Sequence, residues 1–121
     1  MFVAKCHCGK VSLEAKLVPE TVTSCNCSIC YRIGAIWAYY FKEQVKVVGA
    51  EMTNTYLWGD KTRTYHSCSV CHCVTHYTQI RDDGIRVAIN SRMVAPGQTH
   101  GIKVREFDGA GTFEYIKKSD T

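Results

Sequence analysis

The stretch Cys25-Asn26-Cys27-Ser28-Ile29-Cys30 places three thiols within six residues, at C-x-C-x-x-C spacing. An extended strand cannot bring these sulfurs together, because successive side chains on a strand point to opposite faces. A tight turn can direct all three sulfurs toward one ion, and three protein ligands leave the fourth position of a tetrahedral zinc ion for water or substrate. The pattern therefore indicates an open, potentially catalytic zinc site at Cys25, Cys27 and Cys30.

Three other interpretations of this stretch stay open on the sequence alone. The thiols could include a redox-active C-x-x-C pair, or a distant fourth residue could close the site, or the thiols could simply be buried. Spacing without structural context does not choose among these alternatives.

The composition sets limits on the kind of protein. The chain has 121 residues with eight cysteines, 45% hydrophobic residues and 21% charged residues, which fits one modest hydrophobic core and argues against general disorder. The first residues lack the apolar run of a signal peptide, and no segment suits a membrane span. We therefore expect a cytoplasmic protein without a membrane partner. In the reducing cytoplasm, clustered cysteines bind metal or carry out chemistry more often than they form disulfides, so a disulfide scaffold is the less favoured alternative.

The charge pattern argues against a nucleic-acid partner. The formal net charge is +4, but Lys and Arg are scattered among Asp and Glu, and only Lys117 and Lys118 are adjacent. A solvated surface explains this distribution better than a basic patch for phosphates.

Short strands are expected to make up most of the chain, because no window shows a sustained apolar period of 3.6 residues. Residues 11–17 alternate apolar and polar side chains, which predicts a strand with Val11, Leu13, Ala15 and Leu17 facing the core. Residues 35–41 are aromatic and largely apolar, which predicts a central strand buried on both faces.

Other elements follow from turn signals. Further strands are expected at residues 45–49, 55–58, 62–66, 74–80 and 84–89, with hairpin turns at 59–61 and 81–84. Residues 91–98 should include a short helical or irregular turn ended by Pro96-Gly97, the segment to Asp108-Gly109 should be a surface loop, and residues 112–116 a last strand.

A second cysteine set is predicted to be structural. Cys68-Ser69-Val70-Cys71 is a C-x-x-C knuckle at the end of a hairpin strand, and such knuckles form half of many structural zinc sites. The matching half should be Cys6 and Cys8, which Gly9 follows with the conformational freedom that a tight turn needs. An ion that joins segments about 60 residues apart would strongly constrain the unfolded chain.

Two side chains near the first stretch are candidates for substrate binding. Arg32 follows Cys30 by two positions, where it could hold a carboxylate or balance the charge of the thiolates. Trp37 could wall a substrate pocket or fill the core.

Taken in order, the cysteine motifs resemble one known family. Cys6-His7-Cys8-Gly9-Lys10-Val11, then Cys25-Asn26-Cys27-Ser28-Ile29-Cys30-Tyr31-Arg32, then Cys68-Ser69-Val70-Cys71 resemble the glutathione-dependent formaldehyde-activating enzyme family, which includes centromere protein V. Residues 87–93 and 107–110 resemble the C-terminal half of the family, so that the resemblance covers nearly the whole chain. It implies a mainly β, antiparallel fold of the β-tent type, with short sheets held by a structural zinc and very little helix.

The resemblance also implies a function for residues 1–121 as a single zinc-binding domain. It implies two zinc ions, a structural one held by Cys6, Cys8, Cys68 and Cys71, and a second one held by the catalytic cysteines Cys25, Cys27 and Cys30. The implied activity is that of a carbon–sulfur lyase, which joins glutathione and formaldehyde as S-(hydroxymethyl)glutathione. The alternatives are a thiol- or redox-responsive zinc module without catalysis, or a zinc-stabilised interaction domain.

The chain departs from the family pattern after the knuckle. His72 and Cys73 stand where the family usually has glycine and a small residue. If a strand begins at the knuckle, Cys71 and Cys73 share a face, one pleat apart. Cys73 is then a buried thiol, a spare ligand of the structural ion, or a fourth ligand that closes the second site, and we favour the buried thiol.

Overall fold

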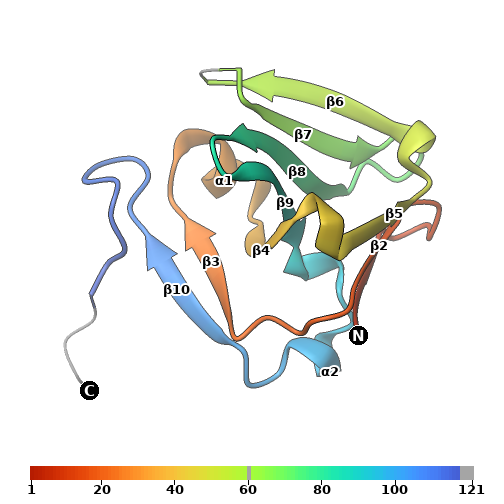
Figure 1. Cartoon of the computed structure of the whole chain (residues 1–121), viewed down its shortest axis with the longest axis horizontal. Helices are drawn as coiled ribbons and strands as arrows, with labels where there is room; N and C mark the ends of the chain where they lie inside the picture. The colour runs from red at the N-terminus through yellow and green to blue at the C-terminus, as the bar shows by residue number, and fades with distance from the viewer. Residues whose placement is uncertain (60, 118–121) are drawn as a thin grey trace.

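The computed structural model describes residues 1–59 and 61–117, and over these ranges the protein is mainly β, as predicted (Figure 1). Strands β1 (Phe2–Lys5), β2 (Ser12–Ala15) and β5 (Val45–Val48) form a three-stranded antiparallel sheet in the order β1-β2-β5.

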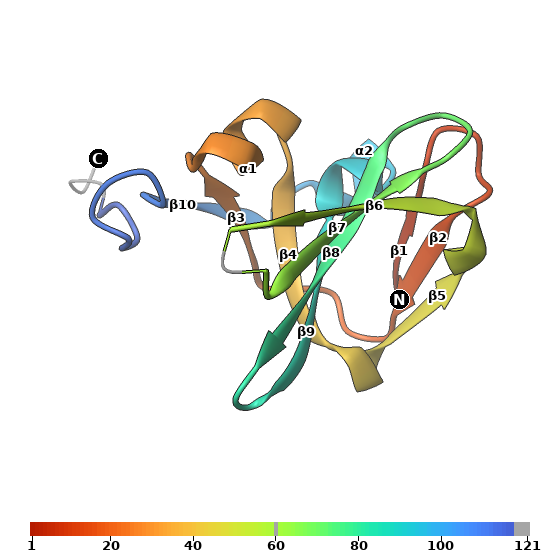
Figure 2. The ribbon, with the colours of Figure 1, turned by 90° about the horizontal axis from the view of Figure 1, so that it is seen from above.

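A second, seven-stranded sheet carries the rest of the strands, in the order β10-β3-β4-β9-β8-β7-β6. Its members are β3 (Thr21–Cys25), β4 (Ile36–Phe41), β6 (Thr53–Trp58), β7 (Arg63–Cys68), β8 (Val74–Arg81), β9 (Gly84–Asn90) and β10 (Lys103–Phe107). Figures 1 and 2 agree that β10 lies at one end of the molecule and the three-stranded sheet at the other.

The prediction of a surface loop before Asp108 was wrong, because Lys103–Phe107 forms the strand β10. This strand pairs with β3 in parallel, with Val104 opposite Val22, whereas the other named pairs are antiparallel. The sheet is therefore mixed rather than wholly antiparallel. The predicted strand at residues 112–116 was also wrong, since only an isolated bridge joins Tyr115 to Phe107 there.

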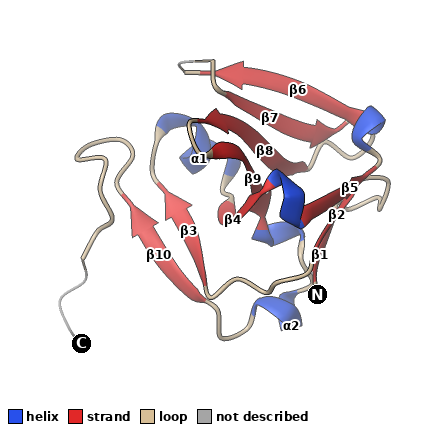
Figure 3. Ribbon diagram, in the orientation of Figure 1, coloured by secondary structure: helices blue, strands red, loops and turns tan. Residues whose placement is uncertain are grey.

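Helix is scarce in the described part of the chain, as expected, and its pieces lie between strands (Figure 3). The pieces are α1 (Ser28–Ile33), α2 (Pro96–Thr99) and three 3-10 turns, η1 (Lys42–Gln44), η2 (Ala50–Met52) and η3 (Ser91–Met93). The helical turn predicted within residues 91–98 is present. Pro96 was expected to end this turn but instead begins α2, because its fixed φ suits the first helical position.

The alternating stretch 11–17, which contains β2, faces the core as predicted for all but one of its apolar residues. Val11, Leu13 and Ala15 are fully buried, but Leu17 is 63% exposed. The reason is that β2 ends at Ala15, and the Leu17 carbonyl then accepts a hydrogen bond from the Tyr40 hydroxyl at 2.6 Å.

Strand β4 separates the core into two parts. Ala38 and Tyr40 pack into the main core with Phe2 and Leu13 of the three-stranded sheet. Trp37 points to the other face and is buried in an aromatic cluster that includes Cys30. The prediction of a strand buried on both faces is therefore confirmed, and its second face is the one that meets the cysteine stretch.

Both predicted hairpins are present in the large sheet. Strands β8 and β9 pair from His76 with Ile89 to Arg81 with Gly84. Strands β6 and β7 pair up to Trp58 with Arg63, and the central residue of their predicted turn, Asp60, lies outside the described residues.

Candidate functional site

The first cysteine cluster unites the two motifs that the sequence pairs. The sulfurs of Cys6, Cys8, Cys68 and Cys71 all lie within 4.8 Å of one another. The Cys8 sulfur is 3.6 Å from that of Cys6 and 3.5 Å from that of Cys68. A tetrahedral zinc ion with zinc–sulfur bonds of about 2.3 Å separates its ligands by about 3.8 Å. The four thiols therefore have a spacing that suits such an ion.

This cluster links the two sheets. Cys6 follows β1 of the small sheet, and Cys68 ends β7 of the large one. Both residues are buried and pack with Val11. The backbone N–H groups of Val11 and Val70 donate hydrogen bonds to the sulfurs of Cys6 and Cys68, each at 3.4 Å. The loop conformation thus presents a backbone donor to each of these sulfurs.

The second cluster consists of Cys25, Cys27 and Cys30, whose sulfurs also lie within 4.8 Å of one another. Cys25 ends β3, Cys27 is the N-cap residue of α1, and Cys30 lies within that helix. The Cys27 side chain accepts a hydrogen bond from the backbone N–H of Cys30 at 3.5 Å. The same spacing therefore places Cys27 at the helix cap and brings the three sulfurs together, where they could hold a metal ion.

The helix itself replaces the tight turn expected from the sequence. It has six residues, too few for an apolar period to show. A usable signal was Gly34, which caps the helix with φ of 73° while its N–H bonds the Cys30 carbonyl at 2.9 Å.

Cys73 lies with the first cluster and not with the second. It is partly buried beside Cys6, Val11 and Cys68. The prediction that Cys71 and Cys73 share one face of a strand was wrong, because β8 begins only at Val74 and His72 adopts a left-handed φ of 65°. Among the described residues, the second cluster accordingly groups three cysteines without Cys73.

Trp37 connects the second cluster to the aromatic part of the core. Its indole Nε1 donates a hydrogen bond to the Cys30 sulfur at 3.3 Å. Its ring meets that of Tyr77 edge-on at 4.8 Å, and Tyr77 lies 5.2 Å from Tyr65. Trp37 is thus both a core residue and a neighbour of the thiols, so the two interpretations of this residue do not exclude each other.

A cavity of about 470 Å³ opens beside the three thiols. Aromatic rings form a large part of its wall, and polar side chains lie along β7, β8 and β9. The lining residues are Cys25, Cys27, Cys30, Trp37, Tyr39, Arg63, Tyr65, Tyr77, Gln79, Arg81, Arg86, Phe107, Gly109, Phe113 and Tyr115.

The prediction that Arg32 serves this site is not supported. Arg32 does not line the cavity and instead donates from Nη1 to the Ser28 carbonyl at 2.8 Å. Two residues along a helix correspond to about 200° of rotation, so Arg32 and Cys30 point in nearly opposite directions. The polar residues that do line the cavity, such as Arg63 and Arg86, were missed because their common face depends on strand pairing.

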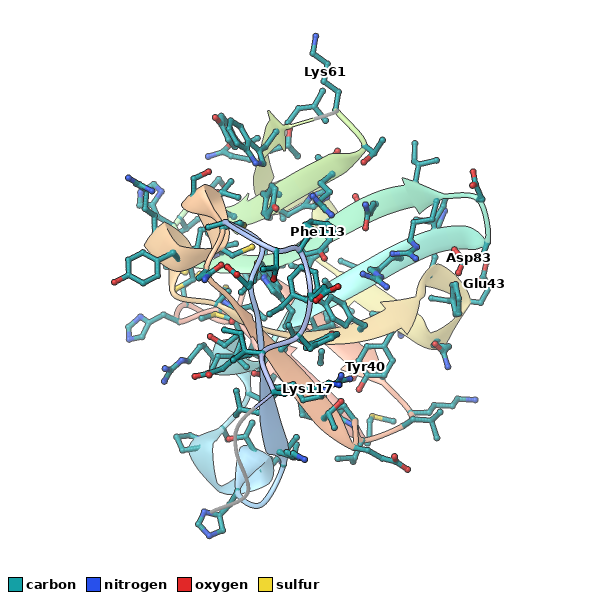
Figure 4. The ribbon with its side chains drawn as sticks, turned by 90° about the vertical axis from the view of Figure 1, so that its left-hand side faces the viewer. Tyr40, Glu43, Lys61, Asp83, Phe113 and Lys117 are labelled. Atoms are coloured by element: carbon teal, nitrogen blue, oxygen red, sulfur yellow. The ribbon has the colours of Figure 1, made fainter. Side chains whose placement is uncertain are left out.

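The segment after β10 covers one side of the cavity. Asn26 donates to Asp108 and accepts from the backbone N–H of Ala110, both at 3.0 Å. A Cβ on Gly109 would lie 2.7 Å from the Cys25 sulfur, so the backbone approaches the thiol as closely as only glycine allows. In Figure 4, where this side faces the viewer, the segment carrying Phe113 passes in front of the large sheet.

The thiols of the second cluster differ in acidity. The pKa of Cys25 is lowered to about 5, chiefly by a hydrogen bond from the Cys30 thiol, against the opposing effect of burial. The pKa of Cys30 is raised by the same hydrogen bond and by burial. Burial raises the pKa of Tyr39, Tyr65 and Tyr77, so these three hydroxyl groups stay neutral. The cavity thus contains ionisable thiols and guanidinium groups beside aromatic rings.

Comparison with known proteins identifies the family of this chain. The family model for the glutathione-dependent formaldehyde-activating enzyme matches residues 1–103. The chain belongs to this family. A crystal structure of a Rhodobacter sphaeroides protein is similar, with a TM-score of 0.68 and 28% sequence identity over 84% of this chain and 98% of that one. The search of curated proteins gave no match.

Family membership confirms the resemblance drawn from the three cysteine motifs. The family is described by a glutathione-dependent, formaldehyde-activating function, and the two cysteine clusters could hold metal ions. In the described part of the chain, no helix has the length and apolar character needed to cross a membrane.

Proposed function

We propose that this protein is a zinc-dependent carbon–sulfur lyase-type enzyme that interconverts glutathione plus formaldehyde and S-(hydroxymethyl)glutathione. The observation that carries the proposal is the second cluster, in which three thiols converge at the wall of an aromatic cavity. Three ligands suit a catalytic zinc with an open position, whereas the four thiols of the first cluster suit a closed structural zinc.

The two clusters have separate roles in this proposal. Cys6, Cys8, Cys68 and Cys71 hold the structural ion and tie the two sheets into one zinc-binding domain. Cys25, Cys27 and Cys30 hold the second ion. A zinc ion with an open position stabilises an incoming thiol as the thiolate near neutral pH.

The residues around the second cluster prepare the site for a thiol. Trp37 fixes the orientation of Cys30 through the hydrogen bond to its sulfur. The rings of Tyr65, Tyr77 and Phe107 line the cavity and limit the access of water to the reacting atoms. In the reaction, the glutathione sulfur attacks the formaldehyde carbon to form the C–S bond, and the π bond of the carbonyl breaks with its electron pair going to the oxygen. The proton lost by the thiol is balanced by one gained at this oxygen. Glutathione is then the small-molecule partner, and the cytoplasm, which keeps thiols reduced, is the expected compartment.

A second candidate is a thiol-responsive metal module without catalysis. The open cavity beside the cluster favours it, because a competing thiol could reach the metal and displace protein ligands. Both candidates predict thiol binding, but only the enzyme accelerates adduct formation.

Exchange spectroscopy by NMR separates the two candidates. The rate of exchange between glutathione and S-(hydroxymethyl)glutathione is measured in the presence of formaldehyde and protein loaded with two zinc ions. We expect the wild-type protein to accelerate exchange and Cys30→Ala to leave the uncatalysed rate. If the fully metallated wild-type protein also gives the uncatalysed rate, the enzyme proposal fails and the thiol-responsive module replaces it.

A further inference from the structure

Three polar side chains form a row on the cavity wall. Arg63 lies opposite Gln79 in the pairing of β7 with β8, and Gln79 lies opposite Arg86 in the pairing of β8 with β9. Directly opposite residues of an antiparallel pair point to the same face of the sheet. All three line the cavity. The row therefore presents two guanidinium groups that flank one carboxamide.

Neither guanidinium group has a carboxylate partner among the residues that the structure describes. Within residues 1–59 and 61–117, the ion pair of this region joins Arg81 to Asp83 at 3.3 Å, and neither Arg63 nor Arg86 takes part in one. Among residues 1–59 and 61–117, none of those that line the cavity is acidic. Arg86 instead lies over the Tyr39 ring, with its Cζ 4.2 Å from the ring centroid. Two positive charges thus face the cavity in a geometry that suits a carboxylate ligand.

Gln79 adds an unsatisfied acceptor to the same row. The residue is 9% exposed, and its Oε1 is buried without a hydrogen-bond partner in the described structure. Buried polar atoms in native proteins are nearly always paired, so an orphan acceptor at a cavity wall points to a donor that arrives with a ligand. A ligand with an ammonium or amide N–H beside a carboxylate would satisfy all three members of the row.

The separation of the row from the thiols follows from the contacts along the cavity wall. Trp37 contacts the Cys30 sulfur, and the Tyr77 ring lies 4.8 Å from the Trp37 ring. Gln79 follows Tyr77 on the same face of β8, about 7 Å further along the strand. The row is therefore on the order of 10 Å from the second cluster.

This distance selects among small thiols. In free cysteine the carboxylate is only about 4 Å from the sulfur, roughly one residue length. The γ-glutamyl arm of glutathione adds about two residue lengths and ends in an α-ammonium beside an α-carboxylate. A thiol bound at the second cluster therefore reaches the row only if it carries such an arm.

We propose that Arg63, Gln79 and Arg86 form a subsite for the α-amino-carboxylate end of the thiol substrate, with the arginines on the carboxylate and Gln79 Oε1 on the ammonium. The inference rests on the proposed function in that it places the thiol at the second cluster. It goes further by assigning residues that set the substrate class, a thiol with an amino-acid end group on a γ-glutamyl-length arm.

S-Methylglutathione tests the subsite separately from metal chemistry, because its sulfur cannot become a thiolate. Its affinity for the zinc-loaded protein is measured by calorimetry in the wild type, Arg63→Gln, Arg86→Gln and Gln79→Leu. Loss of a charged hydrogen bond should weaken binding by about tenfold or more in each arginine variant. Arg92→Gln removes an equal charge outside the cavity and should bind like the wild type. Retained zinc content and circular dichroism show which variants are folded, and Arg86→Lys, which keeps the charge without the planar fork, should bind with intermediate affinity.

The outcomes separate the two proposals. Equal affinity of S-methylglutathione for the wild type and the folded arginine variants overturns the subsite. Glutathione should also bind more tightly than cysteinylglycine, which lacks the γ-glutamyl arm, and equal affinities for these two thiols would overturn the subsite while leaving the thiol site intact. If the arginine variants bind S-methylglutathione more weakly, as expected, but the protein does not catalyse adduct formation, the subsite is supported and the proposed reaction is overturned.

Discussion

The indole of Trp37 donates a hydrogen bond to the sulfur of Cys30 across 3.3 Å, in a buried position between β4 and α1. This contact ties the second cysteine cluster to the strand that also packs against the main core. A hydrogen bond to a thiolate sulfur lowers the electron density that the sulfur can give to a metal.

Trp37→Phe should change the second metal site without unfolding the protein. The phenyl ring keeps most of the packing with Tyr77, but the N–H donor is lost. In protein loaded with two cobalt ions, we expect the sulfur-to-cobalt absorption of the second site to shift to lower energy. Trp58→Phe, at a partly exposed position on β6, is the control and should leave the spectrum unchanged. A spectrum of Trp37→Phe identical to that of the wild type would show that the hydrogen bond does not tune the metal.

The two clusters should contribute unequally to folding. Cys68 is fully buried in the cluster that links the two sheets, so metal binding there contributes directly to the free energy of folding. Cys68→Ala should abolish cooperative thermal unfolding or soluble expression, whereas Cys27→Ala should stay folded with about one zinc fewer. Melting curves and zinc content measure both effects. Equal melting curves for the two variants would contradict the assignment of a structural and a catalytic ion.

Gly109→Ala should disturb the second cluster selectively. The added Cβ would lie 2.7 Å from the Cys25 sulfur and 3.0 Å from the Cys27 Cβ, so the covering segment has to move. Overpacking of this kind costs about 1–3 kcal/mol, and the displaced segment should weaken thiol binding. Gly97→Ala meets no atom within 4 Å and is the control. The account is wrong on this point if glutathione binds Gly109→Ala as tightly as Gly97→Ala.

Acid should destabilise the fold partly through His76. Burial lowers its pKa to about 3, with a smaller contribution from His66, whose ring stacks on it at 4.2 Å. Between about pH 6.5 and pH 3, the unfolded chain binds a proton at His76 that the folded protein does not, so stability falls as the pH falls. This group alone contributes up to about 1.4 kcal/mol per pH unit. Above pH 6.5 His76 is neutral in both the folded and the unfolded protein, so it no longer makes stability depend on pH.

Urea unfolding of zinc-loaded protein between pH 7 and pH 4 measures this slope. His76→Gln should flatten the dependence of stability on pH relative to the wild type, even if it lowers stability at pH 7. His100→Gln, at an exposed position, is the control and should keep the slope of the wild type. A slope for His76→Gln as steep as that of the wild type would assign the acid sensitivity to other groups.

The sequence was informative where the chemistry is local. The C-x-C and C-x-x-C motifs predict the cysteine groups because ligand spacing is set by a few neighbouring residues. The Asp-Gly turn between two strand-like segments predicts the hairpin between β8 and β9. The alternation of apolar and polar residues predicts the burial of Val11 and Leu13. Leu17 continued the pattern but is exposed, because alternation does not show where a strand ends.

Features that depend on distant pairing could not be predicted in this way. Strand β10 is mostly exposed and has charged side chains at three of its five positions, so nothing local indicates that it pairs in parallel with β3, about 80 residues earlier in the chain. The row of Arg63, Gln79 and Arg86 exists only through the register of three strands. The short helix that turns Arg32 away from the thiols has six residues, so its Gly34 cap was the one local signal for it.

The most direct test of the account is whether glutathione becomes a ligand of the metal held by Cys25, Cys27 and Cys30. Glutathione is titrated into protein loaded with two cobalt ions, and the sulfur-to-cobalt absorption is followed in the wild type and in Cys30→Ala. We predict a saturable increase in this absorption for the wild type and none for Cys30→Ala, with the first cluster unchanged in both. An unchanged wild-type spectrum at saturating glutathione would contradict the account.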